Sequence, residues 1–441
     1  MRRTRSDPRR DEARQRRPMF MAESSVIEIN LSSIDHNLAV MREMVGDGCL
    51  LCPVVKADAY GLGAARVAKR MAMGGADLFA VFSPEQAAAL AAAAVGKPVL
   101  VLMPVRDFSR GDDLYRMLVS GSLHLTVHDL RHLEQLQRLA EKFATPVPVH
   151  LEVDTGMSRG GCLPEEAGEV LRRIAASRWV RLAGIFTHFS NPRCDPERTR
   201  AQMAAFDGVL ERDRACVPAE CIVHVASSYA ALRHRRFHRS MVRFGLAWTG
   251  LALDGIESGE VLWESEQLRP ILSWRSQLAQ VKCIPAGASV GYGSHWTAER
   301  ETRVGLIPVG YADGYPMCRT GRDPRQVRVR AAGLHGEIEG WAPVIGAVNM
   351  DQIAIDLSDV EGLAELPGEG VGAEVELVGE DRDAPNHLAS VAAAAGIVPY
   401  EFLCRLNQRI RRVYRTDERA ASAPPVDRAR ASARVAQGGA G

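Results

Sequence analysis

Lysine is scarce in this chain. Only five of its 55 basic residues are lysines, and one of them, Lys56, lies in the stretch VVKADAYGLGA, between an apolar run and a glycine-punctuated turn. An ammonium group is costly to bury beside an apolar strand. A lysine at this position is therefore a candidate for a chemical role.

A surplus of basic charge is also missing, because the formal net charge is +1 at pH 7. Nucleic-acid-binding domains usually carry a basic excess, so we expect no nucleic-acid partner. No apolar run approaches the ~20 residues of a membrane-spanning helix, so we expect no membrane association. Nine cysteines, an odd number without regular spacing, favour free thiols in a reducing compartment, which indicates the cytoplasm.

The two ends of the chain lack the features of folded segments. Residues 1–22 are rich in arginine and have no apolar segment of the kind that a secretory signal needs. Residues 416–441 are rich in alanine, arginine, serine and proline. We expect both ends to be disordered tails that take no part in the chemistry.

Short apolar runs alternate with helical stretches over the first half of the chain. Strand–helix alternation predicts a parallel sheet, and eight units favour a closed (β/α)8 TIM-like barrel over an open sheet. A Gly-x-Gly-x-x-Gly turn is missing after the first run, which disfavours a dinucleotide-binding fold. The eight predicted strands are residues 52–58, 78–83, 99–105, 123–129, 147–156, 182–190, 221–228 and 241–250.

After about Leu268 the sequence becomes β-rich, with Gly, Pro and Asp turns between apolar runs. That texture predicts a second, mostly antiparallel β domain. The opening segment 25–31 is a candidate for pairing with it. We predict a barrel domain over residues 23–264 and a β domain over residues 265–415.

Polar residues recur at the carboxyl ends of the predicted barrel strands, where barrel enzymes place their active sites. Each has a plain structural alternative: a core histidine for His188, a helix cap for Ser228 and an ion pair for Arg243. Their convergence on one face nevertheless indicates a site. The residues are Lys56, Arg159, His188, Ser227, Ser228 and Arg243.

A partly buried lysine has a lowered pKa and becomes nucleophilic, which suits an imine with the aldehyde of pyridoxal phosphate. The serines and the amides near Gly245 could hold the phosphate. An arginine facing the pyridine nitrogen can only donate to it, so the ring stays unprotonated and withdraws less charge from a carbanion. Long-lived carbanion intermediates and transamination are then disfavoured.

These residues lie in motifs that resemble the alanine racemases, a family of pyridoxal phosphate enzymes built from a barrel and a β domain. The resemblance covers about residues 25–415. The motifs are VVKADAYGLGA (54–64), VDTGMSR (153–159), THF (187–189), HVASS (224–228), RFGLAWTGL (243–251), VGYGSHW (290–296), IPVGYADGYP (307–316), NMDQ (349–352) and YEFLC (400–404).

The resemblance implies a cofactor, pyridoxal 5'-phosphate, no metal, and a homodimer with shared active sites. It implies that Lys56 and Tyr292 are the two catalytic bases, with Tyr292 reaching into the other subunit's site. It implies that His188 orients Tyr292 and Arg243, and that Arg159 contacts both cofactor and substrate. The remaining implied cofactor residues are Tyr60, Ser228, Arg243, Gly245, Leu246 and Tyr400, and the remaining substrate residues are Tyr311, Asn349, Met350 and Asp351.

The chain departs from the family pattern at four positions. Glu152 stands where many members have a lysine, and we expect its carboxylate either to supply negative charge to Arg159 or to point into packing. Leu62 replaces a histidine, Ser227 an asparagine and Asn349 a cysteine. The resemblance places Asn349 nearest the substrate of these four, where a broader or more polar pocket would change the side-chain preference.

The resemblance therefore predicts interconversion of L- and D-alanine. The alternatives are a broad-specificity, serine or lysine racemase, or a non-catalytic pyridoxal phosphate-binding protein. Non-catalytic carriers resemble a lone barrel, and the VGYGSHW segment argues against them. Decarboxylases of this architecture have an acidic residue at the ring nitrogen, where this chain has Arg243.

Overall fold

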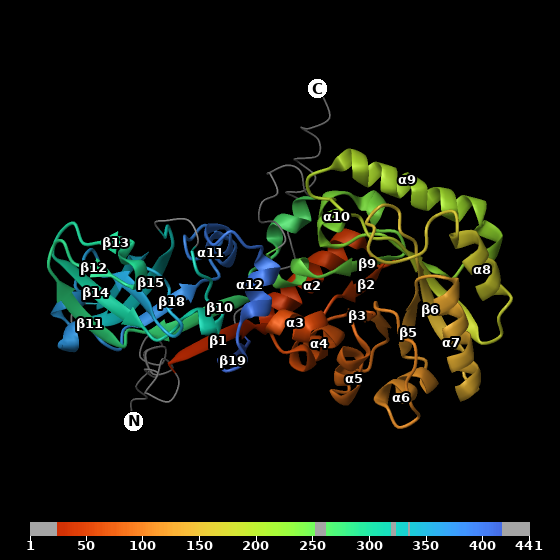
Figure 1. Ribbon diagram of the computed structural model, residues 1–441, viewed down its shortest axis with the longest axis horizontal. Coiled ribbons are helices and arrows are strands. Elements are labelled where there is room, and N and C mark those ends of the chain that lie inside the picture. The colour runs from red at the N-terminus through yellow and green to blue at the C-terminus, as the bar shows by residue number, and fades with distance from the viewer. Residues whose placement is uncertain (1–23, 252–261, 319–322, 334–335, 417–441) are drawn as a thin grey trace, which may run out of the picture.

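The computed structural model describes residues 24–251, 262–318, 323–333 and 336–416. The predicted tails, 1–22 and 416–441, lie outside these residues except for Thr416. A barrel with surrounding helices forms one side of the molecule and a β domain forms the other, with α12 between them (Figure 1).

Eight parallel strands form the barrel, as the sequence predicts. β3 to β8 pair in chain order, and β2 pairs with β9. Bridge Val54–Ala80 joins β2 to β3, and the amide of Arg243 donates to the Ala226 carbonyl at 3.1 Å, which closes the ring between β8 and β9. The strands are β2 (Leu50–Pro53), β3 (Phe79–Val81), β4 (Val99–Val101), β5 (Leu123–Val127), β6 (Val147–Glu152), β7 (Val180–Phe186), β8 (Ile222–His224) and β9 (Met241–Phe244).

Amphipathic helices cover the barrel. In α7 the buried side chains recur every three or four residues, and Asp129 caps the helix by accepting from the amide of His132 at 2.7 Å. The helices are α2 (Leu31–Val45), α3 (Lys56–Gly61), α4 (Ala64–Met73), α5 (Pro84–Ala92), α6 (Asp113–Val119), α7 (Leu130–Phe143), α8 (Ala167–Ala175), α9 (Pro196–Arg212) and α10 (Ser228–Arg233).

After β9 the described chain turns into a short 3-10 segment, η3 (Leu246–Thr249), instead of a long helix. Helix α2, which precedes the barrel strands in the sequence, packs beside η3 and α4 in that position. The buried amide of Asn37 fixes it there by donating to the carbonyls of Trp248 and Arg269 and accepting from the amide of Arg269.

The second domain is built on a nine-stranded sheet in the order β11-β14-β17-β16-β15-β18-β10-β1-β19. All its pairs are antiparallel except β1–β19. The strands are β1 (Ser25–Asn30), β10 (Leu272–Gln277), β11 (Gln280–Ile284), β14 (Thr302–Ile307), β15 (Gln326–Gly333), β16 (Gly336–Ile345), β17 (Ile353–Asp356), β18 (Glu374–Val378) and β19 (Arg411–Arg415). A small hairpin, β12 (Ser289–Val290) with β13 (Trp296–Thr297), and helices α11 (Leu388–Ala394) and α12 (Pro399–Arg405) complete it.

Strand β1 belongs to this second sheet, because it pairs with β10 and β19. The hypothesis that segment 25–31 pairs with the β domain is therefore confirmed. The barrel itself begins with β2, whereas the predicted barrel domain began at residue 23. β1 lies in the sheet of the second domain, and α2, which follows it directly, packs on the barrel. This continuous segment therefore ties the two domains together.

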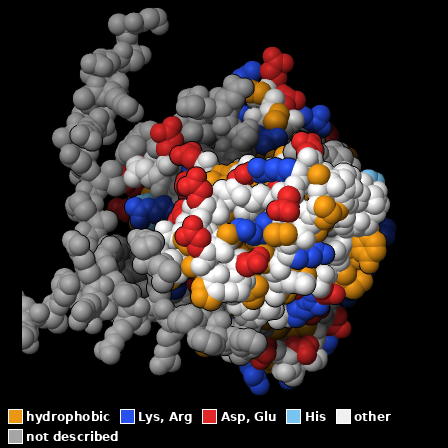
Figure 2. All heavy atoms as spheres, turned by 90° about the vertical axis from the view of Figure 1, so that its left-hand side faces the viewer, with side chains coloured by type: hydrophobic (Ala, Val, Ile, Leu, Met, Phe, Trp, Pro, Cys, Tyr) orange, Lys and Arg blue, Asp and Glu red, His pale blue; other side chains and the backbone are white. Residues whose placement is uncertain are grey.

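Figure 2 views the end of the second domain, where Lys and Arg side chains alternate with Asp and Glu. Within the described residues, no single helix is long and apolar enough to cross a membrane. Only the pair α11 and α12, bent by 96°, meets that length and composition test.

Asn37 gives a direct test of how the barrel is completed. Asn37→Leu removes three hydrogen bonds, one buried and two partly buried, so we expect the free energy of unfolding to fall by about 3 kcal/mol. Urea unfolding followed by circular dichroism measures it. Ala39→Gln, at an exposed position of the same helix, is the control. Equal stability of the two variants would contradict the role given to Asn37.

Candidate active site

The carboxyl ends of the barrel strands bring the predicted residues to one mouth. Lys56 follows β2, Arg159 lies in the loop after β6, His188 follows β7, and Ser228 begins α10 after β8. Two contacts connect β9 to this set. The Arg243 guanidinium lies 3.3 Å from His188 Nδ1, and the Gly245 amide donates to Ser228 Oγ at 2.9 Å. The convergence that the sequence predicted is therefore present.

The turn after Lys56 has an unusual backbone. Ala57, Asp58, Ala59 and Tyr60 all have φ between 51° and 59°, which is the left-handed region. For non-glycine residues this conformation costs roughly 1–2 kcal/mol each. Asp58 stabilises the turn, because its Oδ1 accepts from the Ala64 amide at 2.7 Å. Strain of this kind is typical of functional sites.

Lys56 has the electrostatic surroundings of a reactive amine. Its side chain still reaches solvent, but the surrounding protein partly desolvates the ammonium and lowers the pKa of Lys56, and the positive charge of Arg159 lowers it further. Cys404 acts in the opposite direction. A larger fraction of Lys56 is therefore neutral, and nucleophilic, than for an ordinary surface lysine.

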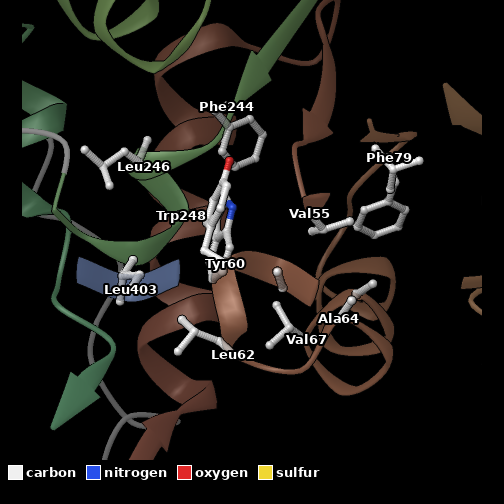
Figure 3. Packing of buried hydrophobic residues seen from close by; sticks show 14 of the residues in the cluster. Val55, Tyr60, Leu62, Ala64, Val67, Phe79, Phe244, Leu246, Trp248 and Leu403 are labelled. Atoms are coloured by element: carbon white, nitrogen blue, oxygen red, sulfur yellow. The ribbon is translucent and has the colours of Figure 1, made fainter. Parts of the chain in front are cut away.

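Aromatic rings support the left-handed turn. Tyr60 is buried, stacks on Trp248 with 5.6 Å between ring centroids, and meets Tyr400 of α12 edge-on at 5.2 Å. Figure 3 shows Tyr60 against Trp248, with Leu62 packed in the same core. Leu62, the unusual residue of this stretch, is fully buried and fills apolar space.

A cluster of small hydrogen-bonding groups lies beside these rings. Ser228 Oγ accepts from the amides of Gly245 and Ala247, and Tyr400 Oη accepts from the amide of Leu246 at 2.9 Å. A Cβ on Gly245 would lie 2.3 Å from Tyr60 Oη, so only glycine fits there.

Three backbone amides and three hydroxyls therefore meet in one place. The Ser228 and Tyr400 oxygens accept from these amides, which leaves the hydroxyl protons to donate to an anion, and an anion can also replace the hydroxyl oxygens as acceptor of the amides. No fixed charge is added, as in many phosphate sites. The residues present fit the phosphate of pyridoxal phosphate. They are Tyr60, Ser228, Gly245, Leu246, Ala247 and Tyr400.

Arg243 is 4% exposed, and burial lowers the pKa of its guanidinium to about 10. Its Nη2 donates to the Thr187 carbonyl at 2.9 Å, and its Nη1 donates to His224 Nδ1 at 2.5 Å and to the His224 carbonyl at 3.1 Å. Its guanidinium also lies over the Phe186 ring, 4.9 Å from the centroid. Arg243 stays charged at neutral pH, and these contacts orient it at the mouth.

His188 is held neutral. Burial, with the positive charges of Arg243, Arg159 and Lys56, lowers the pKa of His188 to about 3. Its Nδ1 accepts from Arg243, so its ring is fixed by the same guanidinium. The core-histidine alternative and the site role are therefore not exclusive at this position.

Tyr292 lies in the second domain, at the tip of the β12–β13 hairpin. Its side chain is 76% exposed. The other predicted residues of the second domain form their own group. Tyr311 donates its amide to the Asn349 carbonyl at 2.9 Å, Met350 is 54% exposed, and Asp351 pairs with Arg409 at 2.7 Å. The surface that these residues share is open in the single chain.

Glu152 has another partner than the sequence suggested. Its Oε2 lies 3.0 Å from His128 Nδ1, with both side chains nearly buried. In the described chain no ion pair joins Glu152 to Arg159, whose side chain is exposed. The physical reason is the loop above it, because a Cβ at Gly161 would lie 2.9 Å from Glu152 Cγ. Glu152 is covered by the backbone at Gly161, and its carboxylate pairs with His128.

Sequence reasoning gave no role to His224 or Trp248, which hold Arg243 and Tyr60 respectively. Both lie inside motifs already quoted, two to four residues from assigned positions. A polar or aromatic residue inside a motif that already carries a site was the signal that could have found them. Ser227, by contrast, directly precedes α10 and serves as its cap residue by backbone geometry.

Comparison with known proteins agrees with this geometry. The family profile described as alanine racemase, N-terminal domain, matches residues 29–252, and that of the alanine racemase C-terminal domain matches residues 271–414. The alanine racemase of Halothermothrix orenii is 32% identical over 392 residues, which cover 88% of this chain and 96% of that protein.

Two solved structures are similar along nearly their full length. The alanine racemase from E. faecalis has a TM-score of 0.75 at 34% identity, covering 90% of this chain and 99% of that one. The alanine racemase from Bartonella henselae with covalently bound pyridoxal phosphate has a TM-score of 0.73 at 26% identity, covering 89% of this chain and 99% of that one.

The neutrality of His188 predicts a pH dependence of stability. In the unfolded chain the pKa of His188 is about 6.5, and in the folded chain it is about 3. As the pH falls below 6.5, His188 is therefore protonated in the unfolded state but stays neutral in the folded state. Stability is therefore lost on acidification, by about 1 kcal/mol between pH 6 and pH 5 for this one group.

Denaturant unfolding at the two pH values measures this loss. His188→Asn keeps an acceptor oxygen in place of Nδ1 but cannot titrate. The variant should lose about 1 kcal/mol less than the original protein over the same interval. Identical losses would show that His188 is protonated in the folded protein.

Proposed function

Because the chain belongs to the alanine racemase family, we propose that it interconverts L- and D-alanine by moving the Cα proton between two bases, Lys56 and Tyr292 of the partner subunit. The family and the enzyme class follow from the two matched profiles and from relatives named alanine racemase. The enzyme is a pyridoxal phosphate-dependent racemase. The residue roles are our proposal.

The observation that carries the proposal is the convergence at the barrel mouth. A lysine with a lowered pKa, a buried arginine and a neutral cluster of amides and hydroxyls lie at the ends of neighbouring strands. When bound, pyridoxal phosphate supplies an electron-withdrawing ring that makes the Cα–H of the attached amino acid acidic. The protein's task is then to bind, orient and move one proton.

Lys56 serves as one base. Its lowered pKa leaves the amine free to accept a proton at Nζ, and the strained turn behind it fixes where Nζ points. Arg159 is proposed to bind the substrate carboxylate, and its positive charge also favours the neutral form of Lys56. Both side chains are exposed, and they are close enough to interact electrostatically.

Tyr292 of the partner subunit is proposed as the second base, on the opposite face of the substrate. Two facts support this. In a single chain Tyr292 is 76% exposed on a projecting hairpin, and exposed Tyr311 and Met350 lie in the same domain. A hydroxyl with a pKa near 10 needs a positive or hydrogen-bonding neighbour to act as base. His188 backed by Arg243 supplies one in a head-to-tail homodimer.

The remaining roles follow from chemistry already described. We propose that Arg243 faces the pyridine nitrogen, which it can only approach as a donor. The phosphate is held by Tyr60, Ser228, Gly245, Leu246 and Tyr400. The substrate entrance of the other subunit is lined by Tyr311, Asn349, Met350 and Asp351.

Location and domain limits are proposed on separate grounds. We propose a cytoplasmic location, supported by nine cysteines that form no disulfide. We propose that the sequence divides into segments 23–264 and 265–415, with β1 of the first segment serving the sheet of the second domain. Matched ranges that stop at 252 and resume at 271 support this division.

A broader substrate range is a second candidate, favoured by Asn349. Its Oδ1 is buried and makes no hydrogen bond among the described residues. An unsatisfied acceptor beside the proposed entrance would favour a substrate side chain that can donate, such as that of serine or lysine.

Asn349→Cys separates these candidates. If Asn349 admits polar side chains, the variant should lose serine and lysine turnover by about tenfold while alanine turnover stays unchanged. A panel of L-amino acids followed by chiral chromatography measures both. Turnover of alanine alone by the original protein would remove the broader candidate.

Mixing two inactive variants tests the shared site. Lys56→Ala and Tyr292→Phe should each be inactive alone. When subunits are exchanged, a mixed dimer carries both defects in one site and neither in the other, so about a quarter of the original activity should return. Polarimetry on alanine measures it. If each site took both bases from one chain, no activity would return.

A further inference from the structure

Three buried histidines continue inward from Arg243: His224, which accepts from its guanidinium, and beyond it His150 and His124, which have no role in the proposed mechanism. His224 Nε2 lies 2.8 Å from His150 Nδ1, and His150 Nε2 lies 2.9 Å from His124 Nδ1. The exposed fractions are 0% for His224, 0% for His150 and 9% for His124. Together with the contact from Arg243 to His224, they form one unbroken row of hydrogen bonds across the barrel interior.

The row of histidines passes one intervening strand, β7, at a glycine. His124 lies on β5, His150 on β6 and His224 on β8, while β7 stands between β6 and β8 in the sheet. At the crossing point β7 has Gly184, paired in register with His150. A Cβ at Gly184 would lie 2.3 Å from His150 Nδ1, the atom that meets His224. Any larger residue would break the row.

The direction of every bond in the row is fixed by its first member. A guanidinium has only donors, so His224 must accept at Nδ1 and carry its proton at Nε2. His224 then donates to His150 Nδ1, which leaves the proton of His150 at Nε2. By the same step His124 accepts at Nδ1 and keeps its proton at Nε2. All three rings are neutral and share one tautomer.

An added proton would break this order. A second proton on any ring would place two hydrogens in one N···N contact, or would force Arg243 to lose its acceptor. Burial lowers the pKa of His124 to about 4 and those of His150 and His224 well below their usual value. Positive Arg181 beside His124 and Arg243 beside His224 act in the same direction.

A metal site is not what this arrangement resembles. The rings meet each other nitrogen to nitrogen instead of converging on one point, and the described residues contain no group of three or more His, Cys, Asp or Glu that could hold a metal ion. Three histidines inside a core that is otherwise apolar are also more than packing requires.

We propose that His150 and His124 are positioning residues for Arg243: acting through His224, they hold its guanidinium as a fixed donor aimed at the barrel mouth. The proposal rests on the proposed function in one respect, the approach of Arg243 to the cofactor ring. Hydrogen bonds in a row polarise one another, so the far rings strengthen the acceptor that Arg243 meets. Gly184 is required for this arrangement, because the absence of a side chain there leaves room for the contact between His150 and His224.

The row can be observed directly in the full-length holoenzyme. With 15N-labelled histidine, solid-state NMR distinguishes ring nitrogens with and without a proton, and N–H···N couplings identify bonded pairs. We expect two such couplings, from His224 Nε2 to His150 Nδ1 and from His150 Nε2 to His124 Nδ1. A proton on Nδ1 of His224, or a mixture of tautomers in the row, would overturn the proposal.

Variants then connect the row to turnover. His150→Leu should abolish both couplings and lower kcat about tenfold, with the KM for alanine unchanged because Arg243 does not bind the substrate. His132→Leu is the matched control, since His132 is a buried histidine of the same barrel whose Nε2 meets only the Val105 carbonyl. If kcat were the same in both variants, the positioning role would be wrong.

The far end of the row provides a second pair, should His150→Leu fail to fold. His124→Asn keeps an acceptor oxygen in place of Nδ1 and should retain the original kcat, whereas His124→Leu should lower it. Equal kcat values for this pair would also overturn the proposal. Failure of the proposed function looks different: the original protein would racemise no amino acid while both couplings remained visible.

Discussion

A charged guanidinium lies inside the barrel, almost wholly removed from water. Such a charge is tolerated only where acceptors surround it, and those of Arg243 are two carbonyls and two neutral histidines. Burial keeps both rings neutral by lowering the pKa of each, and the positive charge of the guanidinium lowers both pKa values further. Side chains and carbonyls inside the barrel therefore surround one positive group, and they fix the direction in which its guanidinium points at the barrel mouth.

The second domain is part of the same construction. Tyr400 of α12 accepts from the amide of Leu246, and Tyr414 Oη donates to the Leu62 carbonyl at 2.9 Å. The proposed phosphate-binding groups and the segment after Lys56 are therefore both held by residues far along the chain. A barrel without this domain would lack those supports. The domain also carries Tyr292, exposed on the β12–β13 hairpin, for which we propose a role in the site of a second subunit.

Sequence alone predicted the eight-stranded barrel, because apolar runs and amphipathic helices alternate. Its long motifs also named candidate site residues, several of which the fold brings to one end of the barrel. It missed what depends on three-dimensional neighbours. The sequence left two alternatives for Glu152, a charge facing Arg159 or a place in packing, and only the fold shows it buried beneath the loop at Gly161 and paired with His128. His124 and His150 lie in strands where each looks like an isolated core histidine. Only the fold shows that these two rings meet across β5 and β6, and that Gly184 on β7 leaves room for His150 to reach His224.

The most direct measurement follows the Cα proton of alanine. The purified holoenzyme is incubated with L-alanine in deuterated water, and proton NMR and chiral chromatography are read together. The account predicts that the Cα–H signal disappears as D-alanine forms, because Lys56 and Tyr292 of the partner subunit exchange their protons with solvent. If neither exchange nor inversion occurred with alanine or any other amino acid, the account would be contradicted.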